Sequence, residues 1–409
     1  MIKKLGYIIK KYCWGIGGLL MLCYFTHSWG FCLDVPNPLI WALLAYIIVR
    51  SIGGRKPYML GVFFLLMCPL GILFFNPDSC FKSWLRYCNF VLLFLAIGPV
   101  FFSRFANIVR KEALNTLVLL SLLTGVISFF CFFLGINYMT MFGAKDMFRE
   151  SAGSFGGLCV HSMTLGPIAA IGCTSLFYGY MRKHKYIYLY LLVCCLGAVF
   201  FAASRAALLA AVAGIAGVAY YVSEKRTKIV KHVMGLCVLA AVTYPVWNQA
   251  TYLMRAKQEA NIDYGGITSS RDLKYIARIY EFSESPLFGV GFCAIDPATG
   301  DEYLASTGTI EPGTSWLQVP SMTGLAGTIP FVLILLASWK NTSRKKFYPQ
   351  RGLLLGLLLT FFLHFFAEGY LFSAGGEMCA FAWLVIASCC MPWIINVDSE
   401  GNMVFIDEL

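Results

Sequence analysis

The sequence predicts an all-α protein that crosses a membrane many times, and three observations support this prediction. Hydrophobic residues make up 59% of the 409 positions and charged residues only 13%, and a water-soluble chain of this length has too little interior to hide so much apolar surface. Apolar segments of about 17–25 residues, the length that spans a bilayer, recur from one end to the other. The Lys and Arg residues gather in alternate connections between these segments, as in polytopic membrane proteins.

About twelve segments are predicted to be membrane helices. The first follows the charged start MIKKLGYIIKK and lacks a convincing small-residue cleavage site, so we expect a retained helix rather than a signal peptide. The second and the seventh are short, which indicates tilted, partly buried or interrupted helices. The predicted spans are 13–32, 38–52, 57–75, 84–103, 113–136, 162–181, 186–203, 206–222, 230–247, 315–338, 352–371 and 375–396.

The basic residues assign the two faces of the membrane. The N-terminal segment and the connections after every second span hold 22 of the 32 Lys and Arg residues, although the opposite connections are longer in total. Positively charged connections stay in the cytoplasm, so both termini are predicted to be cytoplasmic. The net charge of +11 is therefore a signal of topology, and no basic run with interleaved aromatic residues indicates nucleic-acid binding.

Two segments on the predicted outer side are too long to be simple connections. They cover residues 136–160 and 248–314, and the second is inserted between the ninth and tenth spans of a single integral membrane domain, residues 1–409. Loops of this length in a compact protein are usually functional or disordered. The stretch SSRDLKYIARIYEFSES in the second loop is predicted to be a helix, which Pro286 follows.

The predicted loop helix carries a cationic stripe. Arg271, Lys274 and Arg278 lie three and then four residues apart, which places them on one helical face. One interpretation is a face that is solvated or touches anionic lipid headgroups. The other is a clamp for phosphate or pyrophosphate, because a planar guanidinium binds two oxygens at once. The apolar side of the same helix carries Leu273, Ile276, Ile279 and Tyr280.

Arg205 lies at the predicted outer end of the apolar run AASRAALLAAVAGIAGVAYYV, residues 202–222. Its guanidinium can reach the headgroups by snorkelling, or it can hold an anionic ligand among packed helices. The small residues around Arg205 favour close helix packing, and no acidic residue is nearby in sequence. We therefore expect a ligand as the partner of Arg205, on the same side of the membrane as Arg271.

Four stretches occur in an order that is typical of one family. They are SRAALLA at 204–210, SSRDLKY at 269–275, SPLFGVGF at 285–292 and TSWLQVPSMTGLAG at 314–327. With these stretches the chain resembles the O-antigen ligase and Wzy-type polysaccharide polymerase superfamily, and the likeness covers residues 145–385. The resemblance implies a multi-helix glycosyltransferase of the GT-C type in the bacterial inner membrane, with a large periplasmic loop that contains helices.

The resemblance also implies a reaction. Members move a glycan from an undecaprenyl-pyrophosphate carrier to a sugar hydroxyl on the periplasmic side. Such a site needs cations that neutralise the leaving pyrophosphate, a base that takes the hydroxyl proton, and access for the lipid tail. The energy comes from the activated donor, so neither ATP nor a metal or other cofactor is expected. Arg205 and Arg271 match the family arginines assigned to the pyrophosphate, and Arg278 is a weaker third.

The chain departs from the ligase pattern at the base. Ligases commonly carry a His-Asn pair just before the segment that matches LQVPSMTG, whereas this chain has Gly313 and Thr314 there. The nearest acid is Glu311 in EPGTSW, a form typical of a polymerase-like subset of the superfamily, and Glu311 is the first candidate for the base. The alternative is that Glu311 only caps the tenth span, with Pro312 in its first turn.

Two further polar clusters face the same side. His364 and Glu368 in HFFAEGYLFSAGGE lie four residues apart near the outer end of a membrane helix, and both are additional catalytic candidates. The alternative is a His–Glu pair that only locks two helices together. Arg149 and His161 in RESAGSFGGLCVHSMTLGP resemble the family's outer segment near the donor and are weaker candidates for substrate binding.

Together these features favour a polymerase of lipid-linked repeat units of an O-antigen, capsule or exopolysaccharide. One alternative is a ligase that delivers the glycan to lipid A-core or to protein. A flippase for the same lipid-linked sugars belongs to a different class, but no internal repeat is visible and the charges gather on one side. A structural subunit would leave the outer arginines unexplained. The expected partners are the bilayer, the carrier-linked donor and acceptor, and a separate regulator of chain length.

Overall fold

The computed structural model describes residues 15–52, 57–138, 155–222, 271–296, 310, 312–343, 350–390, 395–397 and 403–405. Within these ranges helices dominate, and two three-residue strands, β1 (Ile395–Val397) and β2 (Met403–Phe405), pair antiparallel. The helices are α2 (Ile16–Ser28), α3 (Asn37–Ser51), α4 (Met59–Met67), α5 (Leu70–Phe75), the 3-10 helix η1 (Ser79–Phe81), α6 (Ser83–Ile97), α7 (Arg104–Phe133), α9 (Ser162–Lys183), α10 (Ile187–Phe201), α11 (Arg205–Val222), α14 (Asp272–Glu284), α16 (Ser315–Ser343), α17 (Gln350–His364) and α18 (Glu377–Cys390).

These helices confirm the all-α membrane class. Four described helical stretches are long and apolar enough to cross a membrane, namely Ser79–Ile97, Arg104–Phe133, Arg205–Val222 and Ser315–Ser343. The predicted span 57–75 is divided into α4 and α5 at Pro69. Helix α7 begins at Arg104, earlier than predicted, because the Ser103 hydroxyl caps it by accepting from the Ala106 amide at 3.2 Å. The predicted span 230–247 lies outside the described residues.

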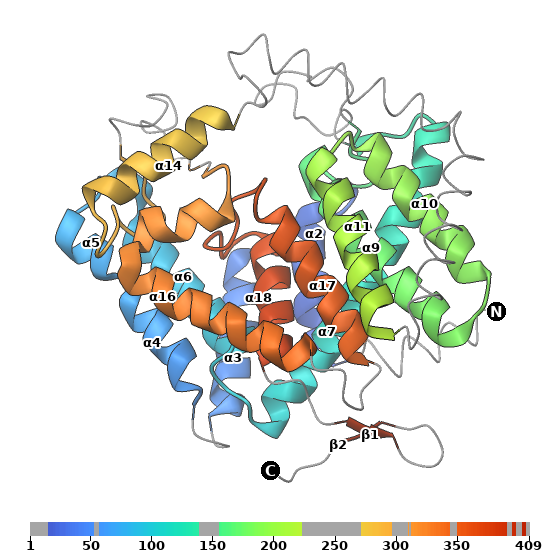
Figure 1. The fold of residues 1–409 in the computed structure, drawn as a ribbon, viewed down its shortest axis with the longest axis horizontal. Helices are drawn as coiled ribbons and strands as arrows, with labels where there is room; N and C mark the ends of the chain where they lie inside the picture. Colours follow the sequence, from blue (N-terminus) through green and yellow to red (C-terminus); the bar gives the residue numbers. More distant parts are fainter. Residues whose placement is uncertain are drawn as a thin grey trace.

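Helices α9, α11 and α17 pack closely through small residues (Figure 1). Gly214 of α11 faces Thr174 of α9 and Thr360 of α17, whose hydroxyl oxygens lie 3.0 Å apart. A side chain at Gly214 would overlap both hydroxyls. Close packing of this kind is how membrane helices associate in a solvent as apolar as their own side chains.

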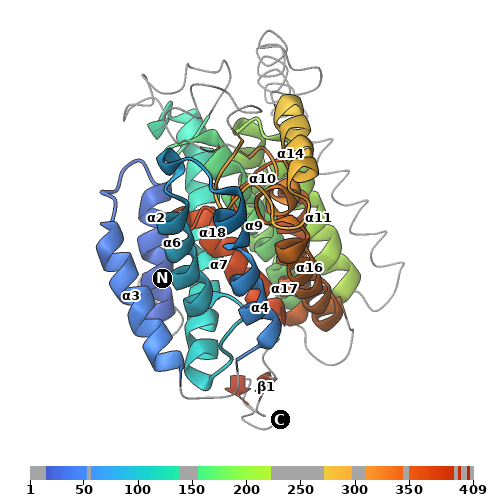
Figure 2. The same ribbon diagram turned by 90° about the vertical axis from the view of Figure 1, so that its left-hand side faces the viewer.

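The packing of α11 along α17 determines which helix ends meet. Gly217 of α11 faces Gly356 of α17, and Val222 faces Gly352, so the two helices run antiparallel. The start of α11 therefore lies level with the end of α17. Helix α14 lies at this same end of the bundle, and strands β1 and β2 lie at the opposite end (Figure 2). The antiparallel register thus brings Arg205 to the end of the molecule that carries α14.

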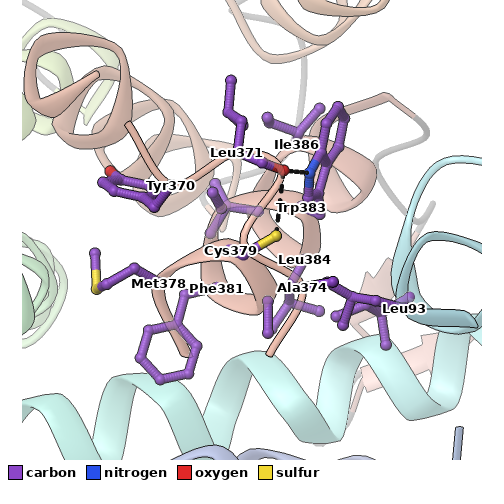
Figure 3. Close-up of a cluster of buried hydrophobic side chains, with 14 of the residues drawn as sticks. Leu93, Tyr370, Leu371, Ala374, Met378, Cys379, Phe381, Trp383, Leu384 and Ile386 are labelled. Carbon is purple, nitrogen blue, oxygen red and sulfur yellow. Dashed lines mark hydrogen bonds between the residues drawn. The ribbon is translucent and has the colours of Figure 1, made fainter. Parts of the chain in front are cut away.

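The larger hydrophobic core surrounds α18 and fixes the connection between α17 and α18. The buried Trp383 ring packs at 4.7 Å from Phe94 and 5.5 Å from Phe64. Its Nε1 donates to the Leu371 carbonyl at 2.8 Å, and the Cys379 thiol donates to the same oxygen at 3.2 Å (Figure 3). The backbone that follows α17 is therefore held by the core at Leu371.

Helix α16 is broken at Gly324, whose φ of 57° and ψ of −161° lie outside the helical region. The stretch SPLFGVGF fills the break, because the Leu325 amide donates to the Pro286 carbonyl at 2.8 Å and the Ala326 amide to the Leu287 carbonyl at 3.0 Å. These two amides would otherwise be unsatisfied at the start of the second half-helix. A Cβ at Gly324 would overlap the Leu287 backbone, which explains why glycine is required there.

Arg110 is a membrane-helix arginine whose role the sequence analysis did not anticipate. Its side chain is fully buried and donates to the carbonyls of Ile97 at 2.9 Å, and of Gly98 and Phe101 at 2.6 Å each. These carbonyls belong to the connection between α6 and α7. Arg110 therefore shapes a turn rather than marking a charged surface.

Candidate functional site

The end of α17 and the start of α16 are joined by a dense set of hydrogen bonds. The Thr314 hydroxyl and the Ser315 amide donate to the Phe365 carbonyl at 2.8 and 2.9 Å. The Ser315 hydroxyl donates to the Glu368 carbonyl at 2.6 Å. Both carbonyls lie in the backbone that follows His364, the last residue of α17. The polar residues of the TSW stretch therefore hold the backbone next to Glu368 in one position.

Helix α14 docks onto the same junction. The Tyr275 hydroxyl donates to the Phe366 carbonyl at 2.6 Å, and the Arg271 guanidinium forms an ion pair with the Glu368 carboxylate. Gly313 has a φ of +78°, and a Cβ there would lie 2.9 Å from the Lys274 side chain. The stretch 312–315 is thus enclosed by α14 and the end of α17, and Arg271 lies beside it.

The Arg271–Glu368 pair is partly open to solvent, with side-chain exposures of 26% for Arg271 and 20% for Glu368. Burial raises the pKa of the neighbouring Tyr275 phenol, an effect that Arg271 opposes. Tyr275 therefore stays neutral and donates its hydrogen bond to the Phe366 carbonyl.

Helix α14 has the reverse of the usual amphipathic orientation. Its cationic face points into the protein, whereas the apolar residues are each at least half exposed, namely Leu273, Ile276, Ile279 and Tyr280. The interpretation of the cationic stripe as a solvated face is therefore wrong. The apolar face is left for contact with lipid or with another apolar surface.

Arg278 is the most deeply buried member of the stripe, at 4% exposure. Its guanidinium pairs with Glu281 at 2.5 Å, and the same Glu281 oxygen accepts from the Asp296 amide at 2.9 Å. Burial lowers the pKa of Arg278, and the Glu281 carboxylate opposes this change. Arg278 therefore connects α14 to the stretch that ends at Asp296. The sequence predicted Arg278 as a third pyrophosphate ligand, but in the structure its side chain is buried in this contact.

His364 and Glu368 each have a partner other than one another. Helix α17 ends at His364, so Glu368 follows the helix instead of lying on its face. The His364 ring Nδ1 lies 3.1 Å from the Tyr370 hydroxyl, and the imidazole is 2% exposed. Glu368 pairs with Arg271. His364 and Glu368 therefore do not form the pair that the sequence analysis gave as an alternative.

Arg205 is exposed at the first position of α11. The Ser204 hydroxyl before it caps the helix by accepting from the Ala207 amide at 3.2 Å. Ala203 has a φ of 51°, in the left-handed region that costs a residue with a Cβ about 1 kcal/mol or more. The turn between α10 and α11 is thus strained two residues before Arg205, at the end of the bundle that carries the Arg271–Glu368 pair.

The remaining candidates have different outcomes. His161 caps α9, since its Nδ1 accepts from the Met163 amide at 3.0 Å. Arg149 and Glu311 lie outside the described residues. The cap of α16 comes from Thr314, whose hydroxyl accepts from the Trp316 amide at 3.2 Å. Pro312 precedes the first turn of α16, so the alternative that Glu311 and Pro312 build the start of this helix is not supported.

Three residues of this junction were missed as contributors to the site. Tyr275, Thr314 and Ser315 all lie in stretches quoted for the family resemblance, and each uses its side chain to bind the end of α17. For Thr314 and Ser315, the signal in the sequence was a run of hydrogen-bonding residues beside Pro312 and Gly313. That run indicated a loop, but it could not indicate which distant carbonyls the loop would bind.

The chain resembles known proteins in the region that contains these elements. Residues 190–332 match the model of the O-antigen ligase family. The match confirms the resemblance to the superfamily of O-antigen ligases and Wzy-type polymerases. It includes Arg205, Arg271 and the break in α16, and it ends before Glu368. No curated protein matches the chain.

Proposed function

We propose that this multi-pass membrane protein, which carries an O-antigen ligase domain at residues 190–332, is a polymerase of lipid-linked oligosaccharide repeat units. The donor is a glycan on undecaprenyl pyrophosphate, and the acceptor is a sugar hydroxyl of a second carrier-linked unit. The reaction takes place on the periplasmic face of the bacterial inner membrane, with both termini in the cytoplasm. The protein is a glycosyltransferase of the GT-C type.

One observation carries this proposal: the Arg271–Glu368 pair lies beside the stretch 312–315, at the same end of the bundle as Arg205. A diphosphate is the ligand that suits two guanidinium groups, because each can bind two of its oxygens. Neutralising the diphosphate makes it a better leaving group, since negative charge develops on it as the sugar departs. Arg278, which is buried, supports α14 instead of binding the ligand.

The proposed step breaks the bond between the anomeric carbon of the donor sugar and its phosphate oxygen. The acceptor hydroxyl oxygen forms the new bond to that carbon, and its proton passes to a carboxylate. The electron pair of the broken bond stays with the carrier pyrophosphate, which Arg205 and Arg271 hold. Glu311 is the first candidate for the carboxylate. Glu368 orients Arg271 and is the second candidate, and His364 is too buried to act without a rearrangement.

The polymerase is favoured over a ligase by the sequence of the stretch before α16. The chain has EPGTSW where ligases commonly carry the His-Asn pair. Gly313 and Thr314 at this position have structural tasks, since Gly313 fits against Lys274 and Thr314 caps α16. A ligase with lipid A-core as the acceptor is the second candidate, because the donor chemistry is the same.

The orientation of α14 supports contact with the carrier lipid. Its exposed apolar face lies at the same end of the bundle as the ion pair, and Leu287 beyond it is also exposed. An amphipathic helix that presents apolar residues outward is stable at the boundary between headgroups and acyl chains. The polyprenyl tail of a bound donor would then remain in lipid while its pyrophosphate reaches Arg271.

Purified protein in lipid nanodiscs tests the proposed function. It is incubated with carrier-linked repeat units and without ATP or metal, and the products are separated by length. The proposal expects a ladder of longer glycans and release of free undecaprenyl pyrophosphate. Glycan transfer only when lipid A-core is added would identify a ligase. Movement of the carrier-linked glycan across the liposome membrane, without formation of a glycosidic bond, would identify a flippase and overturn the proposal.

A further inference from the structure

A polar cavity lies at the end of the bundle that carries α14, apart from the Arg271–Glu368 pair. Its volume is about 310 Å³, within the range of natural ligand sites. Four elements meet around it: the first half of α6, the stretch at Cys293, the start of α16, and the connection between α17 and α18. The lining residues include Arg86, Asn89, Gln318, Phe372, Ser373 and Gly375.

Gln318 is the feature of this cavity that indicates a ligand. It lies one turn into α16, where its amide donates to the Thr314 carbonyl at 3.0 Å, and its side chain is 1% exposed. Its side-chain oxygen Oε1 is buried and accepts no hydrogen bond from the described part of the chain. Buried amide oxygens are normally hydrogen-bonded, because leaving them unpaired in a protein interior is costly. A ligand hydroxyl in the cavity would satisfy this oxygen.

The opposite wall of the cavity is rigid and has room for a ligand. Leu371 precedes Phe372, the first residue of this wall, and its carbonyl is bound to the core by Trp383 and Cys379 (Figure 3). The Gly376 amide donates to the Ser373 carbonyl at 2.7 Å, which closes a tight turn. Apart from the chain neighbours of Gly375, no atom of the described residues lies within 4 Å of the position that a Cβ at Gly375 would take.

We propose that this cavity binds a sugar ring of the acceptor glycan, an assignment that rests on the proposed function. A sugar has hydroxyl edges and apolar C–H faces, and the cavity offers both kinds of surface. Gln318, Asn89 and Ser373 provide hydrogen-bonding groups, and Arg86 adds a cation that donates to sugar oxygens. Phe372 and Ile310 provide the apolar surface.

The location of the cavity suits an acceptor. Ile310 and Gln318 line the cavity, and the stretch 312–315 between them contacts Lys274 and the end of α17 at Glu368. The cavity and the Arg271–Glu368 pair are thus both next to one short stretch of chain. A sugar held by Gln318 would place the acceptor glycan next to a donor pyrophosphate held by Arg271.

A binding experiment tests the inference without requiring turnover. The probe is the repeat unit prepared as an octyl glycoside, which has no pyrophosphate and can act only as an acceptor. Its binding to the full-length protein in nanodiscs is measured by saturation-transfer NMR. We expect binding to the wild type, and affinity about tenfold weaker or worse in Gln318→Leu and Gly375→Trp. The matched control is Thr328→Val, on the same helix outside the cavity.

Turnover measurements separate this inference from the proposed function. With saturating donor, the KM for the octyl glycoside should rise about tenfold in Gln318→Leu, with a smaller change in kcat. Wild-type elongation with unchanged acceptor binding and KM in both cavity variants would overturn the acceptor site and leave the polymerase standing. If the probe binds in a way that depends on Gln318 but no elongation occurs, the proposal of a sugar site stands and the proposed polymerase function is wrong. Absence of probe binding to the wild type would also overturn the sugar site.

Discussion

Arg271 and Glu368 lie 97 positions apart in sequence and form an ion pair at the end of the bundle that carries α14. The pair joins α14 to the end of α17, so it connects the long loop to the membrane helices. Its partial exposure matters for function, because a fully buried pair would leave no room for an anionic ligand. The proposed chemistry depends on Arg271 binding a pyrophosphate while Glu368 holds the guanidinium in place.

Replacing Arg205 or Arg271 by Lys should abolish most of the activity. A lysine keeps the charge but cannot bind two phosphate oxygens with a planar fork, so we expect kcat/KM to fall about 100-fold or more. The measurement is glycan elongation in nanodiscs, with membrane expression as the check on folding. Arg104→Lys, at the start of α7, is the matched control and should keep wild-type rates. Full activity of Arg271→Lys would reduce its role to charge steering.

Exchanging the two charges should separate structure from ligand binding. In the double variant Arg271→Glu with Glu368→Arg an ion pair can still form, and a pair that solvent reaches contributes only about 1 kcal/mol or less. We expect thermal stability within a few degrees of the wild type and no detectable transfer, because the cation has moved away from α14. Recovery of activity in the double variant would show that the pair is only structural.

Glu311 should be required for turnover. The variant Glu311→Gln keeps the size of the side chain and removes its ability to accept a proton, so we expect kcat to fall about 100-fold or more. The variant Thr314→Val, three positions further along the chain, is the contrast, because it removes the α16 cap and should lower stability by about 1 kcal/mol. If Glu311→Gln keeps its rate, the role of the base passes to Glu368.

Gly324→Ala should destabilise the protein strongly. Gly324 has a φ of 57° and a ψ of −161°, a conformation that essentially only glycine adopts, and its new Cβ would overlap the Leu287 backbone. The expected cost is about 1–3 kcal/mol for the backbone alone, visible as a lower thermal transition and lower membrane yield. Gly375→Ala, where open space surrounds the Cβ, is the matched control. Equal stability of the two variants would contradict this account of the break in α16.

The exposed face of α14 should affect the use of lipid-linked donors. Ile276→Asn replaces an apolar side chain on this face with a polar one, and we expect the KM for the carrier-linked donor to rise about threefold or more. A donor with a short soluble prenyl chain should show no such change, because it does not use the lipid contact. An equal effect on both donors would show that Ile276 stabilises α14 itself.

Much of the fold was readable from the sequence because the membrane imposes a strong rule. Each span must be apolar and helical, so composition and segment length identified most of the helices correctly. Local rules also explain the main differences in their bounds, since Pro69 divides one predicted span and Ser103 starts another helix early. The small strands β1 and β2 were not anticipated, because three-residue segments carry no periodic signal.

The sequence by itself determined the membrane class, the helical stretches and the resemblance to one superfamily, because these depend on local composition and on motifs in order. The tertiary structure alone decided which polar groups meet. Glu368 pairs with Arg271 instead of His364, and the cationic face of α14 turns inward. Such pairings depend on how helices far apart in the chain pack against one another. The sequence pattern of a single helix does not predict that packing.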